Sequence, residues 1–149
     1  MYKRILVPTD GSSCSEAAAK QALGLAKLLD GEVTFLYAID PVPPALAAEA
    51  YGYAVYAEQL IADLRKAAEE ALAKAAALAE AEGVRYQTRL EPNARPVDAI
   101  VAAMSAFDLV VMGSHGRTGV RRLILGSVTD GVMRQSTKPL LVMRCGADK

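Results

Sequence analysis

Short apolar runs, each closed by proline, glycine or polar residues, predict the strands of this chain. The first run, Ile5-Leu6-Val7, is ended by Pro8-Thr9-Asp10-Gly11, a pattern typical of a buried strand followed by a turn. Over 84–90 apolar and polar residues alternate loosely, a pattern typical of an edge strand. The remaining strands are predicted at 33–39, 107–112 and 139–143.

The first interval between strands carries the signals of a capped helix. Ser13 and Glu16 have capping-box spacing, and they predict a helix that runs to about Asp30. Gly31 follows as a natural helix end. After the second strand, three prolines and an Ala/Tyr-rich stretch predict a variable loop over 41–57.

A long helix is predicted over 58–82, and Gly83 ends it. Its apolar residues recur at steps of three and four and predict a face that packs in the core, not a cofactor site. Pro96 begins another helix, and the last helix runs from Ser127 to about Ser136. The apolar face of the long helix consists of Leu60, Ile61, Leu64, Ala68, Ala71, Leu72, Ala75, Leu78 and Ala79.

The alternation of strands and helices predicts an α/β fold: an open five-stranded parallel sheet with helices on both faces. Right-handed crossovers favour the strand order 3-2-1-4-5, in which the chain reverses direction between strands 1 and 4. Ligands bind at the carboxyl ends of the strands that flank such a switch point. We therefore expect Pro8-Thr9-Asp10-Gly11 and Gly113-Ser114-His115-Gly116 to converge on one crevice.

Composition narrows the class of protein. With 149 residues, 52% of them hydrophobic, the chain is expected to form one globular domain, 1–149. Zero net charge argues against nucleic-acid binding, and no apolar run approaches the roughly 18 residues of a membrane span. The first residues have the pattern of a strand, not of a signal peptide, so a cytoplasmic location is expected. Cys14 and Cys145 are then expected to be reduced and inert, and the single histidine, His115, excludes a protein-held zinc site.

The segment 112–127, MGSHGRTGVRRLILGS, has the chemistry of an anion site. Its glycines allow close approach of the backbone, and Gly126-Ser127 opens a helix whose first N–H groups are able to hold a phosphate. The hydroxyls of Ser127 and Thr129 are candidate donors, and Arg117, Arg121 and Arg122 add positive charge. Neither GxxxxGK[ST] nor GxGxxG is present, which argues against a P-loop ATPase and a dehydrogenase.

Structural alternatives stand beside these functional interpretations. The glycine segment could be a surface loop, Asp10 could be only a helix-entry turn residue, and the arginines could be solvated. His115 is equally suited to a phosphate contact and to a loop residue bonded to backbone. Three tyrosines could cover the pocket or pack on their own helix: Tyr51, Tyr53 and Tyr56.

The glycine segment has the form G-x2-G-x9-G-[ST], with Gly113, Gly116, Gly126 and Ser127 in register. Together with ILVPTDGS at the start, LYAID after the second strand and LGSVTDGVMRQSTKPLLVMR near the end, it resembles the nucleotide-binding branch of the universal stress protein family. The resemblance covers nearly the whole chain. It implies a Rossmann-like fold of the adenine nucleotide alpha hydrolase type.

The resemblance also implies that ATP is held at the switch point, with Mg²⁺ held mainly by the phosphates. Ala38 would meet adenine through its backbone, and Asp10 would lie near the ribose. Phosphates would be surrounded by the glycine segment and the helix start. The residues implied to bind ATP are Pro8, Thr9, Asp10, Ala38, Met112, Gly113, Gly116, Arg117, Gly126, Ser127, Val128 and Thr129.

Two further points follow from the resemblance. Family members commonly pair their last strands, which implies a homodimer through Pro139 to Arg144. The family often has Gly-x-Pro before the third helix, whereas this chain has Ala94-Arg95-Pro96, so no ligand contact is carried over to that loop.

Three functions are compatible with these residues. The favoured one is a regulatory ATP binder of the stress response with slow or no hydrolysis, because a single carboxylate, Asp10, is a weak candidate for a general base. The second is an ATP hydrolase or phosphotransferase completed by Mg²⁺ and a partner. The third is a dimeric scaffold without nucleotide, against which the intact glycines argue.

Overall fold

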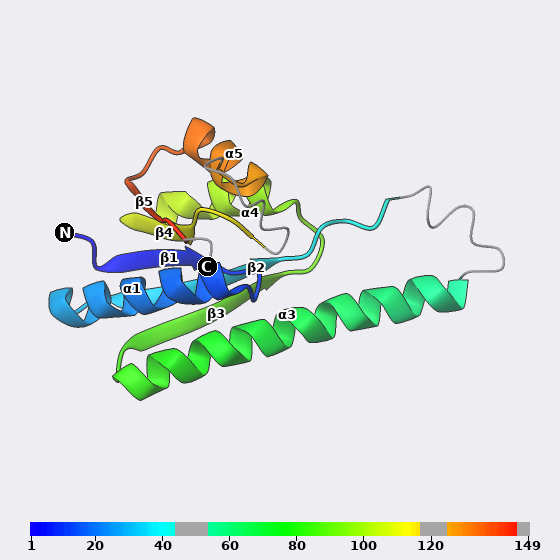
Figure 1. Ribbon diagram of the computed structural model, residues 1–149, viewed down its shortest axis with the longest axis horizontal. Coiled ribbons are helices and arrows are strands. Elements are labelled where there is room, and N and C mark those ends of the chain that lie inside the picture. The colour runs from blue at the N-terminus through cyan, green and yellow to red at the C-terminus, as the bar shows by residue number, and fades with distance from the viewer. Residues whose placement is uncertain (44–53, 117–124, 146–149) are drawn as a thin grey trace.

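The protein folds as an open parallel sheet covered by helices. The structure is a computed structural model, and it describes residues 1–43, 54–116 and 125–145. The five-stranded sheet has the order β3-β2-β1-β4-β5, which confirms the predicted topology (Figure 1). All neighbouring strands run parallel. The strands are β1 (Arg4–Pro8), β2 (Glu32–Ala38), β3 (Arg85–Glu91), β4 (Leu109–Gly113) and β5 (Leu140–Met143).

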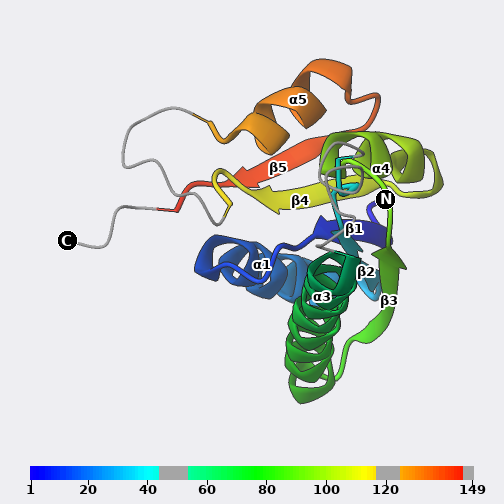
Figure 2. The same cartoon turned by 90° about the vertical axis from the view of Figure 1, so that its right-hand side faces the viewer.

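Helices cover both faces of the sheet, and Figure 2 shows α1 and α3 on one side with α4 and α5 on the other. Successive strand residues point to opposite faces of the sheet, so they contribute to two separate hydrophobic cores. Ile5 and Val7 pack beneath α1 and α3, whereas Leu6 packs beneath α4 and α5. No helix among the described residues is long and apolar enough to cross a membrane. The helices are α1 (Ser13–Leu29), α3 (Ala54–Glu82), α4 (Pro96–Ala103), the 3-10 turn η1 (Met104–Ala106) and α5 (Ser127–Gln135).

The ends of α1 differ from the predicted ones by one residue each. Ser12, not Ser13, is the N-cap, and its side chain accepts a hydrogen bond from the Ser15 N–H at 3.2 Å. Asp30, not Gly31, takes the left-handed conformation at the other end, with φ of 50°. Gly31 is needed for a different reason: a Cβ there would lie 2.7 Å from the carbonyl oxygen of Lys3.

The long helix α3 begins at Ala54, so the predicted loop over 41–57 was too long by its last residues. Its later turns pack as predicted, with Ala68 and Ala79 fully buried. Its first turns extend past the strands, and there Leu60 and Ile61 are 45% and 53% exposed, so their assignment to the core was wrong (Figure 1). Helical periodicity shows which residues share a face but not how far the sheet reaches beneath it.

The two cysteines are joined, which corrects the expectation of two inert thiols. A disulfide links Cys14, in the first turn of α1, to Cys145, just after β5, across 131 positions of sequence. Their Cα atoms are 5.5 Å apart, within the range of protein disulfides. Two cysteines at opposite ends of a chain carry no spacing signal, and only the packing of the start of α1 against the ends of β4 and β5 brings them together.

Candidate nucleotide-binding crevice

A cavity of about 380 Å³ opens at the carboxyl ends of β1, β2 and β4, where the predicted switch point lies. This is the size of a small-molecule site. We call it the crevice. Its described lining consists of Pro8, Thr9, Asp10, Ser15, Leu36, Tyr37, Ala38, Ile39, Asp40, Leu64, Pro96, Ile100, Met112, Gly113, His115, Gly116, Gly126, Ser127, Val128 and Thr129.

The crevice gathers every sequence-predicted binding residue that the structure describes. They come from the end of β1, the end of β2, the end of β4 and the start of α5: Pro8, Thr9, Asp10, Ala38, Met112, Gly113, Gly116, Gly126, Ser127, Val128 and Thr129. Arg117 lies outside the described residues, as do Arg121, Arg122, Tyr51 and Tyr53. Tyr56 is 70% exposed and is not part of the described lining.

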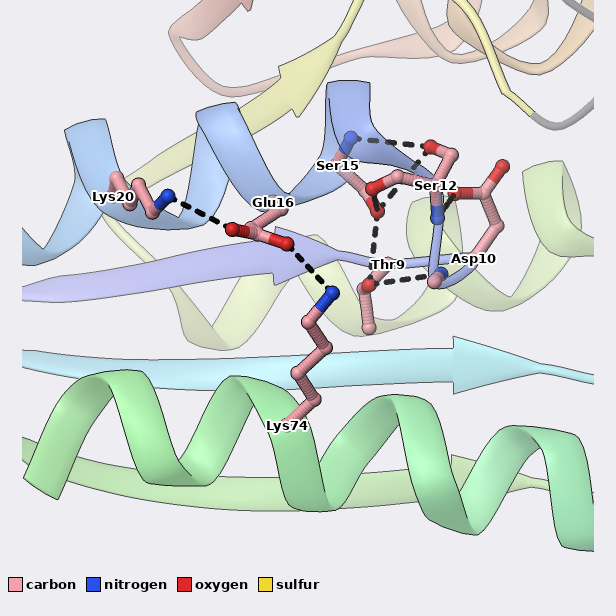
Figure 3. A network of polar contacts seen from close by, with 8 residues as sticks. Thr9, Asp10, Ser12, Ser15, Glu16, Lys20 and Lys74 are labelled. Carbon is pink, nitrogen blue, oxygen red and sulfur yellow. Dashed lines mark hydrogen bonds and ion pairs between the residues drawn. The ribbon is translucent and has the colours of Figure 1, made fainter.

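One wall of the crevice is the turn between β1 and α1. Hydrogen bonds within this turn and to the first turn of α1 hold it in place (Figure 3). Asp10 Oδ1 accepts from the Ser12 N–H at 3.0 Å, so Asp10 is the helix-entry turn residue of the structural interpretation. It also lines the crevice, so the two interpretations of Asp10 are compatible. Thr9 donates from Oγ1 to Ser15 Oγ at 3.1 Å, and the Thr9 N–H donates to the Leu36 carbonyl at 2.9 Å.

The glycines of the opposite wall permit close backbone approach. A Cβ at Gly116 would lie 2.5 Å from Asp10 Oδ2, and one at Gly113 would lie 2.6 Å from Cys14 Sγ. At Gly126 a Cβ would lie 3.1 Å from the Ser114 carbonyl oxygen. The two walls therefore meet where side chains are absent.

The start of α5 presents backbone N–H groups to the crevice. Gly126 is its N-cap and has no side chain that could accept from the first turn. The Thr129 hydroxyl, expected as a phosphate donor, instead donates to the Gly113 carbonyl at 2.8 Å and is 2% exposed. Among the predicted hydroxyl donors of this turn, Ser127 is the one that no described contact occupies.

The remaining wall is apolar, and sequence analysis did not assign most of it. Leu36 and Ile39 come from β2 and its exit, and Leu64 and Ile100 come from α3 and α4. Leu64 had been assigned to the core, and Leu36 and Ile39 to a strand, whereas Ile100 had no assignment beyond its helix. The sequence pattern of these residues does not show that a cavity lies beside them. Ala94 donates its N–H to the Ile39 carbonyl at 3.1 Å and does not have a positive φ, so alanine is accommodated in place of the family's glycine.

The charges of the described lining are carboxylates. Asp10 and Asp40 contribute them, and no lysine or arginine is among the described lining residues. In the part of the chain that the structure describes, no group of three or more His, Cys, Asp and Glu side chains could hold a metal ion. An anion in the crevice would therefore interact mainly with backbone N–H groups and hydroxyls of the described residues.

Ser114 joins three segments behind the glycine wall and is 3% exposed. Its N–H donates to the Met143 carbonyl at 2.8 Å, and its carbonyl accepts from the Gly126 N–H at 2.7 Å. Its hydroxyl accepts from the Cys145 N–H at 3.2 Å and lies 2.8 Å from His115 Nδ1. His115 Nε2 is buried without a hydrogen-bond partner among the described residues.

Next to the crevice, Glu16 links α1 to α3 (Figure 3). Its carboxylate accepts from the ammonium groups of Lys20 and Lys74, each at 2.8 Å. The hydrogen bonds from Lys20 and then Lys74 lower the pKa of Glu16 from 4.5 to about 2. Glu16 therefore does not cap α1 in a capping box, as its spacing from Ser13 had suggested.

The chain matches known proteins over almost its whole length. The model of the universal stress protein family matches residues 1–144. Universal stress protein MJ0531 of Methanocaldococcus jannaschii is 40% identical over 97% of this chain and 83% of its own length. The structure of MJ0577, a universal stress protein of the same organism, superposes with a TM-score of 0.82 at 30% identity and 99% coverage of both chains. A universal stress protein in complex with cAMP has a TM-score of 0.65 at 27% identity, over 96% of this chain and 97% of that one.

Proposed function

The chain belongs to the universal stress protein family, and we propose that it is a regulatory protein of the cytoplasm that binds ATP in the crevice, with slow or no hydrolysis. The observation that carries this proposal is the crevice itself, in which the glycine wall, the apolar wall and the start of α5 enclose about 380 Å³. The complex of a related protein with cAMP supports an adenine nucleotide as the ligand.

The chemistry of the walls suits the parts of a nucleotide. The partly buried side chains of Ile39 and Leu64 offer an apolar surface for a flat base, next to the Ala38 backbone. The N–H groups at the start of α5 and the Ser127 hydroxyl offer donors to phosphate. Asp10, on the wall between these two ends, is placed to accept from ribose hydroxyls.

Mg²⁺ fits this arrangement as an ion bound mainly by the phosphates. The described lining supplies two carboxylates and no cationic side chain, so a triphosphate needs charge neutralisation from elsewhere. When bound, the ion would offset the phosphate charge. Asp10 is the carboxylate on the wall that meets the glycine segment, and its Oδ2 faces Gly116.

The described residues argue for binding more than for cleavage. Of the two lining carboxylates, Asp10 already accepts a hydrogen bond from the Ser12 N–H, an arrangement that serves the turn. A general base for hydrolysis must reach a water beside the terminal phosphate. We expect phosphate release to stay at background under excess ATP and Mg²⁺; multiple turnovers per protein would instead support the hydrolase or phosphotransferase.

Calorimetry with ATP and Mg²⁺ tests the binding function, and Ser127→Ala tests the assignment of the phosphate end. We expect the variant to bind ATP about 10- to 150-fold more weakly, the cost of one hydrogen bond to a charged group, with adenosine affinity unchanged. Ser136→Ala is the matched control, because Ser136 bonds to the Lys138 carbonyl outside the crevice.

Equal losses of affinity for ATP and adenosine in Ser127→Ala contradict the phosphate assignment. No heat and no thermal shift with wild-type protein contradicts nucleotide binding altogether.

We also propose that two copies pair through β5. This strand is at one edge of the sheet, and its side chains are half-buried in the single chain. An edge strand of this kind has backbone donors and acceptors that a second strand can pair with.

A further inference from the structure

The Cys14–Cys145 disulfide lies directly behind the crevice. Cys14 belongs to the first turn of α1, which continues from the turn that forms one crevice wall. Its sulfur packs against Gly113, where a Cβ would be only 2.6 Å away. Figure 2 shows the chain leaving β5 beside the start of α1, where Cys145 completes the bond.

Cys145 is also bonded to the opposite wall, through Ser114. Its N–H donates to Ser114 Oγ, and the Ser114 carbonyl accepts from the Gly126 N–H at the N-cap of α5. Gly126 lines the crevice. One covalent bond and two hydrogen bonds therefore connect the start of α1 to the start of α5.

The same connection reaches His115. The Ser114 hydroxyl accepts from Cys145, so its own proton is available to His115 Nδ1 at 2.8 Å. With Nδ1 as the acceptor, the ring proton is assigned to Nε2. His115 lines the crevice, and it shares the Ser114 hydroxyl with the Cys145 N–H.

We propose that the oxidation state of Cys14 and Cys145 controls the affinity of the crevice for its nucleotide. This inference rests on the proposed binding function. In the oxidised chain the disulfide holds both walls in register, so the crevice is organised before the ligand arrives. In the reduced chain the segment after β5 is released, the Cys145–Ser114 hydrogen bond loses its support, and the nucleotide must order Gly126 and His115 itself.

The redox step is a thiol–disulfide exchange with a dithiol reductant. A thiolate of the reductant attacks Cys145 Sγ, because Cys145 is half-buried whereas Cys14 is 5% exposed. The Cys14–Cys145 bond breaks, and Cys14 leaves as a thiolate that takes up a proton. The second thiol of the reductant then releases Cys145 as a thiol, and the reductant becomes a disulfide. Disulfides of this kind in the cytosol are typically transient and redox-sensing.

Calorimetry with ATP and Mg²⁺ on oxidised, dithiothreitol-reduced and reoxidised protein tests the coupling. We expect reduction to weaken binding about 5-fold or more, the lower end of common coupling strengths, and reoxidation to restore it. Equal affinities in the two states overturn the coupling and leave the proposed function intact. Absence of binding in both states overturns the proposed function and the coupling together. Two free thiols in protein denatured after purification under air also overturn the coupling.

Variants separate the disulfide from general effects of the reductant. The double variant Cys14→Ser, Cys145→Ser is expected to bind like reduced wild type and to show no response to dithiothreitol. A response equal to that of wild type contradicts the assignment. Far-ultraviolet circular dichroism checks that both forms are folded under the conditions of the titration.

Ser114→Ala tests the route without breaking the disulfide. It removes the acceptor of the Cys145 N–H, so the ratio of oxidised to reduced affinity is expected to fall towards one. Ser136→Ala is the matched control and should keep the wild-type ratio. An unchanged ratio in Ser114→Ala overturns the route through Ser114.

The coupling between ATP binding and disulfide formation is reciprocal, so it can also be measured from the redox equilibrium of the cysteines. If the oxidised form binds ATP about 5-fold more tightly, saturating ATP must favour the disulfide by the same factor. A redox titration with dithiothreitol, followed by thiol counting in denatured protein, measures this shift. No shift in the presence of saturating ATP contradicts the proposal.

Discussion

At the scale of single residues, the crevice depends on positions where a side chain is absent. Gly113, Gly116 and Gly126 each lie against an atom of another segment. In that order, the atoms that a Cβ would approach are Cys14 Sγ, Asp10 Oδ2 and the Ser114 carbonyl oxygen. A different neighbour therefore excludes a side chain at each of the three glycines. The sequence motif shows the spacing of these glycines, and the structure shows what each one makes room for.

Gly116→Ala is predicted to weaken ATP binding by about 1–3 kcal/mol, roughly 5- to 150-fold, because the new Cβ would displace Asp10 or the glycine wall. Gly24→Ala is the matched control, since a Cβ at Gly24 meets nothing within 4 Å. That control is expected to keep wild-type affinity and to raise the free energy of unfolding by about 0.5–1 kcal/mol. Calorimetry and thermal melting measure the two effects. Wild-type affinity in Gly116→Ala contradicts the role given to this glycine.

At the scale of elements, α1 is the connection between the crevice and the rest of the molecule. Its first turn carries the Ser12 cap, the disulfide and Glu16. Through Lys74, Glu16 ties α1 to the long helix α3, whose Leu64 lines the crevice. Movement of α1 therefore affects both the glycine wall and the apolar wall.

Glu16 makes the stability of this connection dependent on pH. Its pKa is lowered to about 2 in the folded chain, so its contribution is complete above about pH 4.5 and is lost as the pH falls towards 2. The lysines are 61% and 66% exposed, so solvent screening limits the contribution to about 1 kcal/mol. Glu16→Gln is predicted to lower the free energy of unfolding by that amount at pH 7 and to match wild type near pH 2. Urea unfolding measures both.

Glu69→Gln is the control for this experiment, because it removes an exposed pair with Arg65 within α3. It is expected to change the free energy of unfolding by less than about 0.5 kcal/mol at pH 7. A difference between wild type and Glu16→Gln that persists unchanged at pH 2 argues against ionisation of Glu16 as the cause.

At the scale of the whole molecule, β5 is an edge strand of the sheet, and part of its backbone faces away from β4. The N–H groups of Val110 and Ser114 donate to the carbonyls of Pro139 and Met143. In a parallel ladder alternate residues face opposite neighbours, so Leu140 and Val142 direct their backbone groups away from β4. These outward groups are the ones that a second copy of β5 would use.

Val142→Pro is predicted to convert the proposed dimer to a monomer, because proline removes the outward N–H at the edge. Sedimentation velocity measures the change in assembly. ATP affinity should remain at the wild-type value, since Val142 does not line the crevice. Val142→Thr keeps the N–H and is expected to remain dimeric. A monomeric wild-type protein, or a dimeric Val142→Pro, contradicts pairing through β5.

The sequence determined the topology and the place of the crevice. Alternating strand and helix patterns leave few right-handed arrangements, and the polar, glycine-rich strand ends could only meet at the switch point. Local patterns were less exact at the boundaries: Ser12 caps α1 instead of Ser13, because two adjacent serines give the same pattern and only backbone geometry separates them.

Contacts between distant segments were decided by the tertiary structure alone. The disulfide joins positions 131 apart, Leu60 and Ile61 are exposed because α3 extends beyond the sheet, and Leu64 lines the crevice although its periodicity indicates core. Periodicity is a property of one element, whereas burial and pairing depend on what lies opposite. For this protein the sequence therefore determined where the crevice forms, and only the packing of α1 against the ends of β4 and β5 decided that a disulfide lies behind it.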